Sequence, residues 1–486
     1  MLIIDKIKNK WVKAPVAVKA SSAYAFCSIF QRCLSFVTLP LFTRLLTTQQ
    51  YGQLIVYQSW VGILSIFLTL NLACGSFATA MVKFEHDRDG YISSVEGICV
   101  LLSILFFIVY LPLSNIWNRL FELPTSLMVL MVVELLATTS FQMWCGKKRF
   151  EFEYKAVICL TLLISLVSPV LAYVFVISYE DKGFARILGY ALVTVVVGGF
   201  LFIHTAINGK KIINKGYWRF ALGFNVPLLV YYVSQAIFNQ SDRIMISHMI
   251  GTDKAALYGV AYSLGVVLSF VLSAINGSYV PWYYEKIKNG HQKENRKVSL
   301  AISVFLAVLL SGVIWFAPEI IWIMAGEHYY EAVYVVPPVA LSLLLLFYSQ
   351  LFINVEFYYE KKEQLVKASI FAAILNVVLN WLFLPMFGYT VAAYTTLVSY
   401  VFFAWANYFA MKTVLSEQCI EDCAHDYKRL IFLFLGLCAF SIVGVVLYEY
   451  LFVRLFVFLV LFVLVCVYKN MLNIFFRQFR KNYEVD

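Results

Sequence analysis

Residues 157–178 read VICLTLLISLVSPVLAYVFVIS, twenty-two residues without a single charged side chain. A helix needs about 20 apolar residues to cross the ~30 Å hydrocarbon core of a bilayer, so this stretch predicts a transmembrane helix. The whole chain of 486 residues has the same character, with 62% apolar and 14% charged residues and a mean hydropathy of +0.79. Soluble proteins carry about 25% charged residues, and disordered chains are poor in apolar ones. The composition therefore predicts a polytopic membrane protein.

Fourteen apolar stretches, separated by polar residues or by Gly and Pro, are long enough to cross a membrane. We therefore expect an all-α polytopic membrane protein with fourteen transmembrane helices. The predicted spans are 17–45, 51–82, 91–114, 123–145, 153–178, 184–207, 217–249, 255–284, 297–325, 330–359, 364–386, 388–411, 428–448 and 450–469.

The net charge of +10 is distributed unevenly between alternate connections. With a cytoplasmic N-terminus, thirty of the thirty-eight Lys and Arg residues fall in the inner segments and two, Arg32 and Arg243, fall within spans. Such a bias in short loops follows the positive-inside rule, so we expect both termini in the cytoplasm. The six residues assigned to outer connections are Arg44, Arg119, Lys182, Arg186, Lys254 and Arg454.

The first six spans resemble the next six. Ile29 lies 22 residues before the Tyr51-Gly52 pair, and Ile237 lies 21 residues before the Tyr258-Gly259 pair. An even number of spans gives two lobes of the same orientation, which we expect to enclose a central cavity and to alternate its access. The predicted organisation is a basic amphipathic segment 1–16, an N-lobe 17–210, a C-lobe 211–411, two extra helices in 412–470 and a basic tail 471–486.

Two motifs carry a family resemblance. LPLFTRLL at 39–46 precedes Tyr51-Gly52, and NQSDR at 239–243 precedes Ile250-Gly251 and Tyr258-Gly259. With the spans and repeat, they resemble Wzx-type polysaccharide flippases of the multidrug/oligosaccharidyl-lipid/polysaccharide exporter superfamily. The resemblance implies a two-lobe fold that moves an undecaprenyl-diphosphate-linked oligosaccharide to the outer leaflet, for O-antigen or capsule synthesis. Expected partners are that lipid, membrane lipids, a polysaccharide polymerase and a chain-length regulator, without nucleic acid.

Three other classes of protein are weighed against this one. A multidrug or cation antiporter of the same superfamily would need an acidic site, whereas the central charge of the first span is Arg32. A flippase for peptidoglycan precursor or another polyprenyl lipid is a close alternative. An integral-membrane enzyme would need catalytic loops, and the outer connections are each about ten residues or fewer without a convergent acid–base set, so no enzyme is expected.

Charged groups within spans are expensive and usually face a cavity or a partner. We predict that Arg32 and Arg243, one in each lobe, bind the lipid diphosphate, because a guanidinium stays charged and forks onto phosphate oxygens. The alternative for Arg243 is a structural pair with Asp242. Glu134, central in its span, is predicted as a counter-ion to Arg32 or a protonation site, with a buried structural pair as the alternative.

Two amide pairs at i,i+4 spacing are predicted to bind sugar hydroxyls, or else to bond between helices: Asn376 with Asn380, and Gln350 with Asn354. Pro40 and Pro227 are predicted hinges, since proline removes an intrahelical hydrogen bond. The sequence contains no phosphate-binding P-loop, so no nucleotide cofactor is expected, and a proton or sodium gradient or the membrane potential would drive transport. No metal is expected at Cys419, Cys423 and His425, which lack a fourth ligand.

Overall fold

The computed structural model describes residues 15–361, 363–418 and 425–467, and all regular elements in these ranges are helices. The predicted all-α fold is confirmed. By its internal contacts the chain divides into two compact units, Met1–Ala256 and Leu257–Asp486, which we call unit 1 and unit 2.

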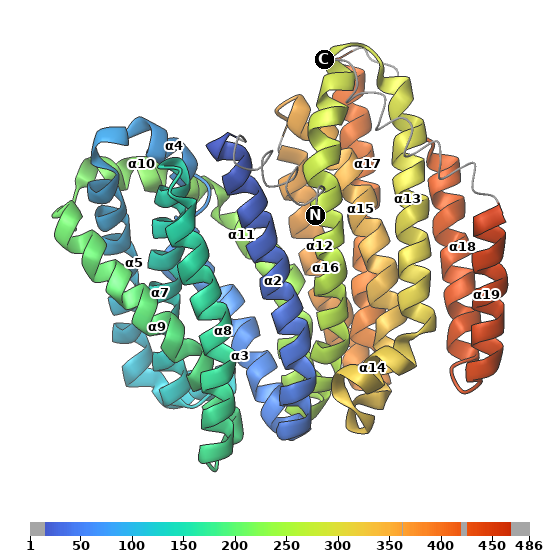
Figure 1. The fold of residues 1–486 in the computed structure, drawn as a ribbon, viewed down its shortest axis with the longest axis horizontal. Coiled ribbons are helices and arrows are strands. Elements are labelled where there is room, and N and C mark those ends of the chain that lie inside the picture. The colour runs from blue at the N-terminus through green and yellow to red at the C-terminus, as the bar shows by residue number, and fades with distance from the viewer. Residues whose placement is uncertain (1–14, 362, 419–424, 468–486) are drawn as a thin grey trace, which may run out of the picture. The chain divides into compact units, whose positions relative to one another are not determined.

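Unit 1 is organised around α9, which packs against α5, α7 and α8 (Figure 1). The helix α3 packs against both α7 and α11, so α11 is held in this unit. The helices of unit 1 are α2 (Val16–Leu45), α3 (Thr48–Thr69), α4 (Phe77–Lys83), α5 (Arg88–Tyr110), α6 (Ser114–Phe121), α7 (Thr125–Phe150), α8 (Tyr154–Ser178), α9 (Lys182–Gly209), α10 (Lys215–Asn225), α11 (Leu229–Met249) and the start of α12 (Thr252–Lys288).

Unit 2 is organised around α15, whose side chains are buried along almost its whole length, to a greater extent than those of the other candidate spans. It packs against α13, α17 and α18. The helices of unit 2 are the rest of α12, α13 (Gln292–Trp315), α14 (Ala317–Ala325), α15 (Val336–Tyr358), α16 (Glu363–Phe387), α17 (Val391–Glu417), α18 (Tyr427–Val446) and α19 (Leu451–Val467).

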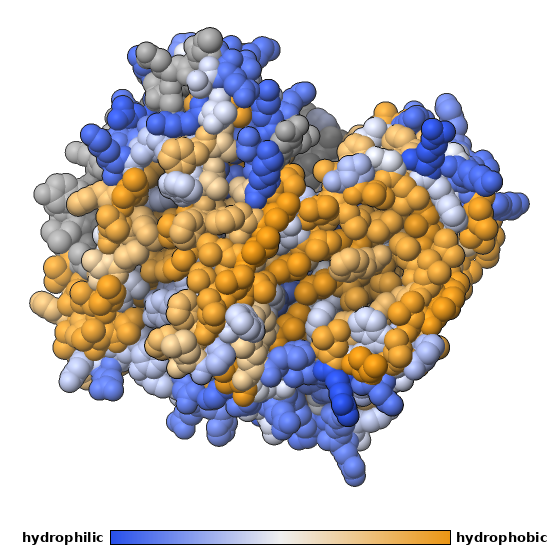
Figure 2. Space-filling model, turned by 180° about the vertical axis from the view of Figure 1, so that it is seen from behind, coloured by the Kyte–Doolittle hydropathy of each residue, from blue (hydrophilic) through white to orange (hydrophobic). Residues whose placement is uncertain are grey.

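Each of the fourteen predicted spans overlaps one or two α-helices of the described chain, and the number of fourteen stays a prediction. Twelve helical segments of the described chain are long and apolar enough to cross a membrane, and α17 and α19 are not among them. In each unit the apolar side chains form a broad band, with hydrophilic residues at both ends of the helices (Figure 2). The chain is therefore a multi-pass integral membrane protein with twelve candidate spans.

Three predicted spans each consist of two α-helices, and one of them, 297–325, is divided at Phe316 into α13 and α14. The span 51–82 ends as α3 at Thr69 and resumes as α4, with Leu70, Asn71 and Gly75 at positive φ between them. The span 217–249 consists of α10 and α11, joined by a 3₁₀ turn, Val226–Leu228, that contains Pro227. Pro227 is one of the predicted hinge residues, whereas the apolar pattern did not indicate the break after Thr69.

The Tyr51-Gly52 pair marks a close helix contact. A Cβ atom on Gly52 would lie 1.9 Å from the backbone oxygen of Thr252, so only glycine permits this approach of α3 to the start of α12. The boundary between the two units falls at 256/257, inside α12, whereas the repeat boundary is predicted at 210/211. A sequence repeat and a compact unit are different properties, so the two-lobe division stays a prediction.

Candidate functional site

The two arginines predicted to bind phosphate lie on different helices of unit 1. Arg32 is exposed on α2, next to Gln31, whose amide donates to the Ser165 hydroxyl of α8 at 3.0 Å. Arg243 is half-buried on α11, and its Nη1 donates to Oε1 of Gln240 at 2.5 Å. The neighbouring Asp242 is buried, with 3% of its surface exposed. Their role in a substrate cavity stays a prediction.

Glu134 is half-buried on α7, and its carboxylate accepts a hydrogen bond from the Tyr57 hydroxyl of α3 at 2.6 Å. Among the described residues its polar partner is therefore Tyr57 and not Arg32. A short hydrogen bond between an acid and a phenol can hold a proton between two helices, so the pair is suited either to proton transfer or to joining α3 and α7.

The amides of α16 form a buried network with α17. Asn376 Nδ2 donates to Thr396 Oγ1 at 3.0 Å, and Asn380 Nδ2 donates to Asn376 Oδ1 at 3.3 Å. The Thr395 hydroxyl donates to Asn380 Oδ1 at 2.5 Å. Both asparagines are fully buried, so this geometry fits hydrogen bonding between helices and not a wet wall for sugars.

The second amide pair lies on α15. Gln350 is half-buried and its Oε1 accepts a hydrogen bond from the Asn276 amide of α12. Asn354 is buried, and its Nδ2 has no hydrogen-bond partner in the described chain. The two residues of the predicted pair therefore differ. Gln350 joins α15 to α12, whereas the Asn354 amide has no hydrogen-bond acceptor among the described residues.

The predicted hinge residues also differ. Pro40 lies inside α2, which is helical on both sides of it, whereas Pro227 lies in the turn that separates α10 from α11. Sequence reasoning missed the residue that fixes this turn. Asn225, fully buried, donates its amide to Ser76 Oγ at 2.7 Å and so links the end of α10 to the break after α3.

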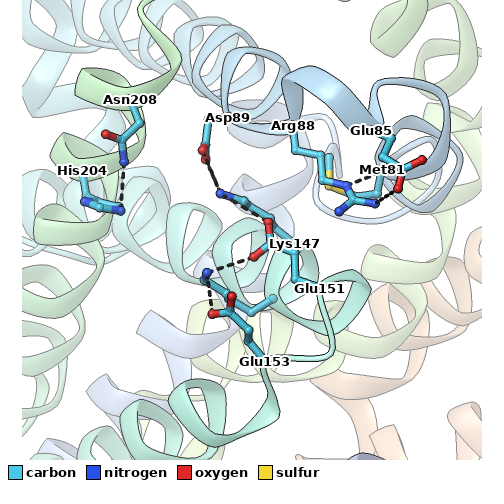
Figure 3. A network of polar contacts seen from close by, with 10 residues as sticks. Met81, Glu85, Arg88, Asp89, Lys147, Glu151, Glu153, His204 and Asn208 are labelled. Carbon is cyan, nitrogen blue, oxygen red and sulfur yellow. Dashed lines mark hydrogen bonds and ion pairs between the residues drawn. The ribbon is translucent and has the colours of Figure 1, made fainter. Parts of the chain in front are cut away.

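A charged network links the start of α5 to the end of α7 in unit 1 (Figure 3). Lys147 of α7 donates to Asp89 of α5 at 2.7 Å and lies 3.6 Å from Glu151. Lys148 pairs with Glu151 and with Glu153, and its hydrogen bond lowers the pKa of Glu153 below the ordinary value. The network joins α5 to α7 and the turn that leads to α8.

The helix α10 lies across this end of α5 (Figure 1). The Trp218 indole donates to the Ser94 carbonyl at 2.8 Å, and Asp87 binds both Lys211 and Tyr217. The hydrogen bond that Lys211 donates to the Asp87 carboxylate raises the pKa of the Lys211 amine.

Two arginines assigned to outer connections prove to be buried. Arg186 lies in the second turn of α9 with 8% of its surface exposed, between the rings of Phe42 and Tyr190. Arg454 lies in the first turn of α19 with 2% exposed and binds Glu319 of α14. Both residues therefore lie inside helices, four and three residues after the first residue of α9 and of α19, and their placement on the outer side stays a prediction.

The fold of the chain is similar to that of solved membrane transporters. A solved structure titled "Lipid II flippase MurJ, inward closed conformation" matches with a TM-score of 0.71 at 14% identity, over 94% of this chain and 99% of that one. An inward-facing multidrug resistance MATE family transporter of the MOP superfamily matches with a TM-score of 0.58 at 13% identity, over 79% and 96%. Both neighbours are transporters, and at these identities the likeness is one of fold.

The family is shown by sequence. Residues 17–286 match the model of the polysaccharide biosynthesis protein family. A protein of the Lsg locus of Haemophilus influenzae is 25% identical over 388 residues, 74% of this chain and 89% of the relative. An uncharacterised membrane protein of the same organism is 23% identical over 383 residues, 74% and 88%. The chain belongs to the polysaccharide biosynthesis protein family.

Proposed function

We propose that this protein moves an undecaprenyl-diphosphate-linked oligosaccharide repeat unit from the cytoplasmic to the outer leaflet of a bacterial inner membrane, by alternating access. The product would feed synthesis of O-antigen or capsule. The observation that carries the proposal is the family match over residues 17–286 in a chain whose helices are arranged as in a solved lipid flippase.

The residues support an anionic lipid as the substrate. Arg32 is a charged side chain on the α2 span and is exposed, so a ligand can reach it. A guanidinium in this position can donate two parallel N–H hydrogen bonds to the oxygens of a diphosphate. Arg243 on α11 is the second candidate contact in unit 1.

The direction of transport follows from charge. The bias of Lys and Arg residues places the Lys147 end of unit 1 and both termini in the cytoplasm. Moving two negative charges outward along an inside-negative potential releases at most about 4.6 kcal/mol at 100 mV. The membrane potential alone therefore favours export of a diphosphate lipid.

Coupling to an ion gradient is a second part of the proposal. Glu134 and Tyr57 join α3 to α7 by a 2.6 Å hydrogen bond, and this pair is the candidate proton carrier. A polysaccharide polymerase and a chain-length regulator are the partners expected to consume the exported lipid.

Deletion of the gene tests the proposal. We expect loss of surface polysaccharide, restored by the wild-type gene and by Arg119→Ala, an exposed arginine of α6, but not by Arg32→Ala at equal protein level. Normal polymer in the deletion strain would refute the function. Normal polymer with Arg32→Ala would refute only the assignment of Arg32.

A flippase for peptidoglycan precursor is the second candidate, favoured by the TM-score of 0.71 to the lipid II flippase. The two functions separate in a strain depleted of its own lipid II flippase. We expect no rescue of growth by this chain, whereas rescue would favour the second function.

A further inference from the structure

Arg186 is placed unlike the other buried arginine of the described chain. Its guanidinium carbon lies 3.5 Å from the ring centroid of Tyr190 on the same helix and 4.0 Å from that of Phe42 on α2. The two rings lie 6.2 Å apart, and buried Tyr51 of α3 interacts with the same charge. Three helices of unit 1 therefore surround one cation.

No carboxylate of the described residues pairs with Arg186. Within the described ranges its guanidinium makes no hydrogen bond or ion pair, and its Nε is buried without a partner. Arg454 in unit 2 shows how this fold otherwise treats a buried arginine, because two of its nitrogens bind the Glu319 carboxylate and one also binds the Trp315 carbonyl. Buried polar groups are nearly always paired, so an unpaired guanidinium needs an explanation.

The aromatic contacts explain only part of the site. The two rings are inclined at 72° to each other, so at most one of them can lie flat against the guanidinium. The rings attract its charge but offer no oxygen acceptor to its N–H donors. Those donors match the oxygens of a phosphate or carboxylate. The nearby Asp181 does not use them, since its carboxylate caps α9 by accepting from the Phe184 amide at 3.0 Å.

The position indicates which anion is available. Arg186 lies one turn from the start of α9, near the end of unit 1 that the proposed function puts outside. Arg44 in the last turn of α2 and Lys182 at the start of α9 are exposed at the same end. Lipid phosphates are the main anions at this depth of a bilayer.

We propose that Arg186, held between Phe42 and Tyr190, is the centre of a phosphate-binding site at the outer end of unit 1, which takes the phosphate or diphosphate headgroup of a lipid in the outer leaflet. This site is separate from Arg32 and Arg243, and it suits a flipped lipid after its diphosphate leaves them. That choice of lipid rests on the proposed function, whereas the phosphate chemistry does not.

Ligand binding to the purified full chain in neutral detergent tests the site. The probes are undecaprenyl diphosphate, undecaprenol, phosphatidylglycerol and inorganic pyrophosphate, each measured by thermal shift and native mass spectrometry. We expect the diphosphate lipid to bind wild type and Arg119→Gln equally, and Arg186→Gln about tenfold more weakly, as loss of a charge-assisted pair implies. Undecaprenol should show no dependence on Arg186.

The outcomes separate the site from the function. Equal binding of the diphosphate lipid by wild type and folded Arg186→Gln would overturn the site and leave the proposed function intact. Binding of phosphatidylglycerol alone through Arg186 would support a lipid-phosphate site and count against the substrate. Binding of pyrophosphate alone would overturn the assignment to a lipid. Absence of any phosphate-dependent binding to wild type would overturn the site.

A second variant covers a failure to fold. Arg186→Lys keeps the charge between the rings but replaces the planar fork by one ammonium. We expect this variant to fold and to bind the diphosphate lipid several-fold more weakly than wild type. Unchanged binding by Arg186→Lys would overturn the forked contact.

Discussion

The guanidinium of Arg454 in α19 binds the carboxylate of Glu319 in α14 through two hydrogen bonds of 2.6 and 2.9 Å. The same guanidinium donates to the Trp315 carbonyl at 2.6 Å. These bonds join α19 to the α13–α14 corner of unit 2. The last helix is therefore fixed by a buried charge in addition to its apolar surface.

Removing one member of this pair should destabilise the protein. We expect Arg454→Ala to lower the free energy of unfolding by about 3 kcal/mol, because the substitution strips two charged bonds and a carbonyl bond. Denaturant unfolding in micelles measures the change. Arg119→Ala, at an exposed position, is the control and should cost less than about 0.5 kcal/mol.

Asn225 and Gly75 should show coupled effects on stability. Gly75 has a φ of +46°, and a Cβ atom there would lie 2.2 Å from Asn225 Oδ1. We expect Gly75→Ala to be strongly destabilising and Asn225→Ala to cost about 1–3 kcal/mol for the lost Ser76 bond. In the double variant the clash is gone, since the Tyr232 hydroxyl then lies 3.4 Å away.

The double variant should therefore be more stable than the sum of the two single effects predicts, by at least about 1 kcal/mol. Additive effects would show that the contact between the α3 break and the end of α10 carries no energy.

Each hydrogen bond of the amide network between α16 and α17 should make a small contribution to the free energy of unfolding. Thr395→Val and Asn380→Leu are each expected to cost about 1 kcal/mol, since interhelical hydrogen bonds in membranes are worth about that much. Thr413→Val, an exposed threonine that bonds only within α17, is the matched control. If Thr395→Val and Asn380→Leu were as stable as the wild type but no longer transported the substrate, the result would instead favour contact of these residues with the substrate's sugars.

A pH profile tests the role of Glu134. If this carboxyl carries the coupling proton, Glu134→Gln should fold normally and transport at a rate that no longer changes with pH. Tyr57→Phe removes the 2.6 Å bond but keeps the carboxyl, so the pH dependence should shift and persist. An unchanged profile in Glu134→Gln would assign the pair to joining α3 and α7.

The helices were predictable because apolar length decides where a chain can cross a membrane. The run at 157–178, for example, lies within α8 as expected. The break after Thr69 was not predictable, because Leu70 and Asn71 take positive φ there and Ser76, at the end of the break, is bonded by Asn225, which is 149 residues away in the sequence.

The candidate site was predictable only in part. Sequence placed Glu134 in the membrane but could not show Tyr57 beside it, since 77 residues separate them. Arg186 and Arg454 looked alike, as single cations near the ends of spans. Glu319 pairs with one and no described carboxylate pairs with the other, a difference that only tertiary packing creates.

Transport of a labelled lipid by the purified protein in sealed vesicles tests the central claim most directly. The substrate is an undecaprenyl-diphosphate oligosaccharide with a fluorescent sugar, and movement is read from quenching by an impermeant reductant. We predict movement that depends on wild-type protein, is lost in Arg32→Ala and does not occur with the corresponding undecaprenol glycoside. Equal movement in protein-free vesicles, or of the lipid without phosphate, would contradict the account.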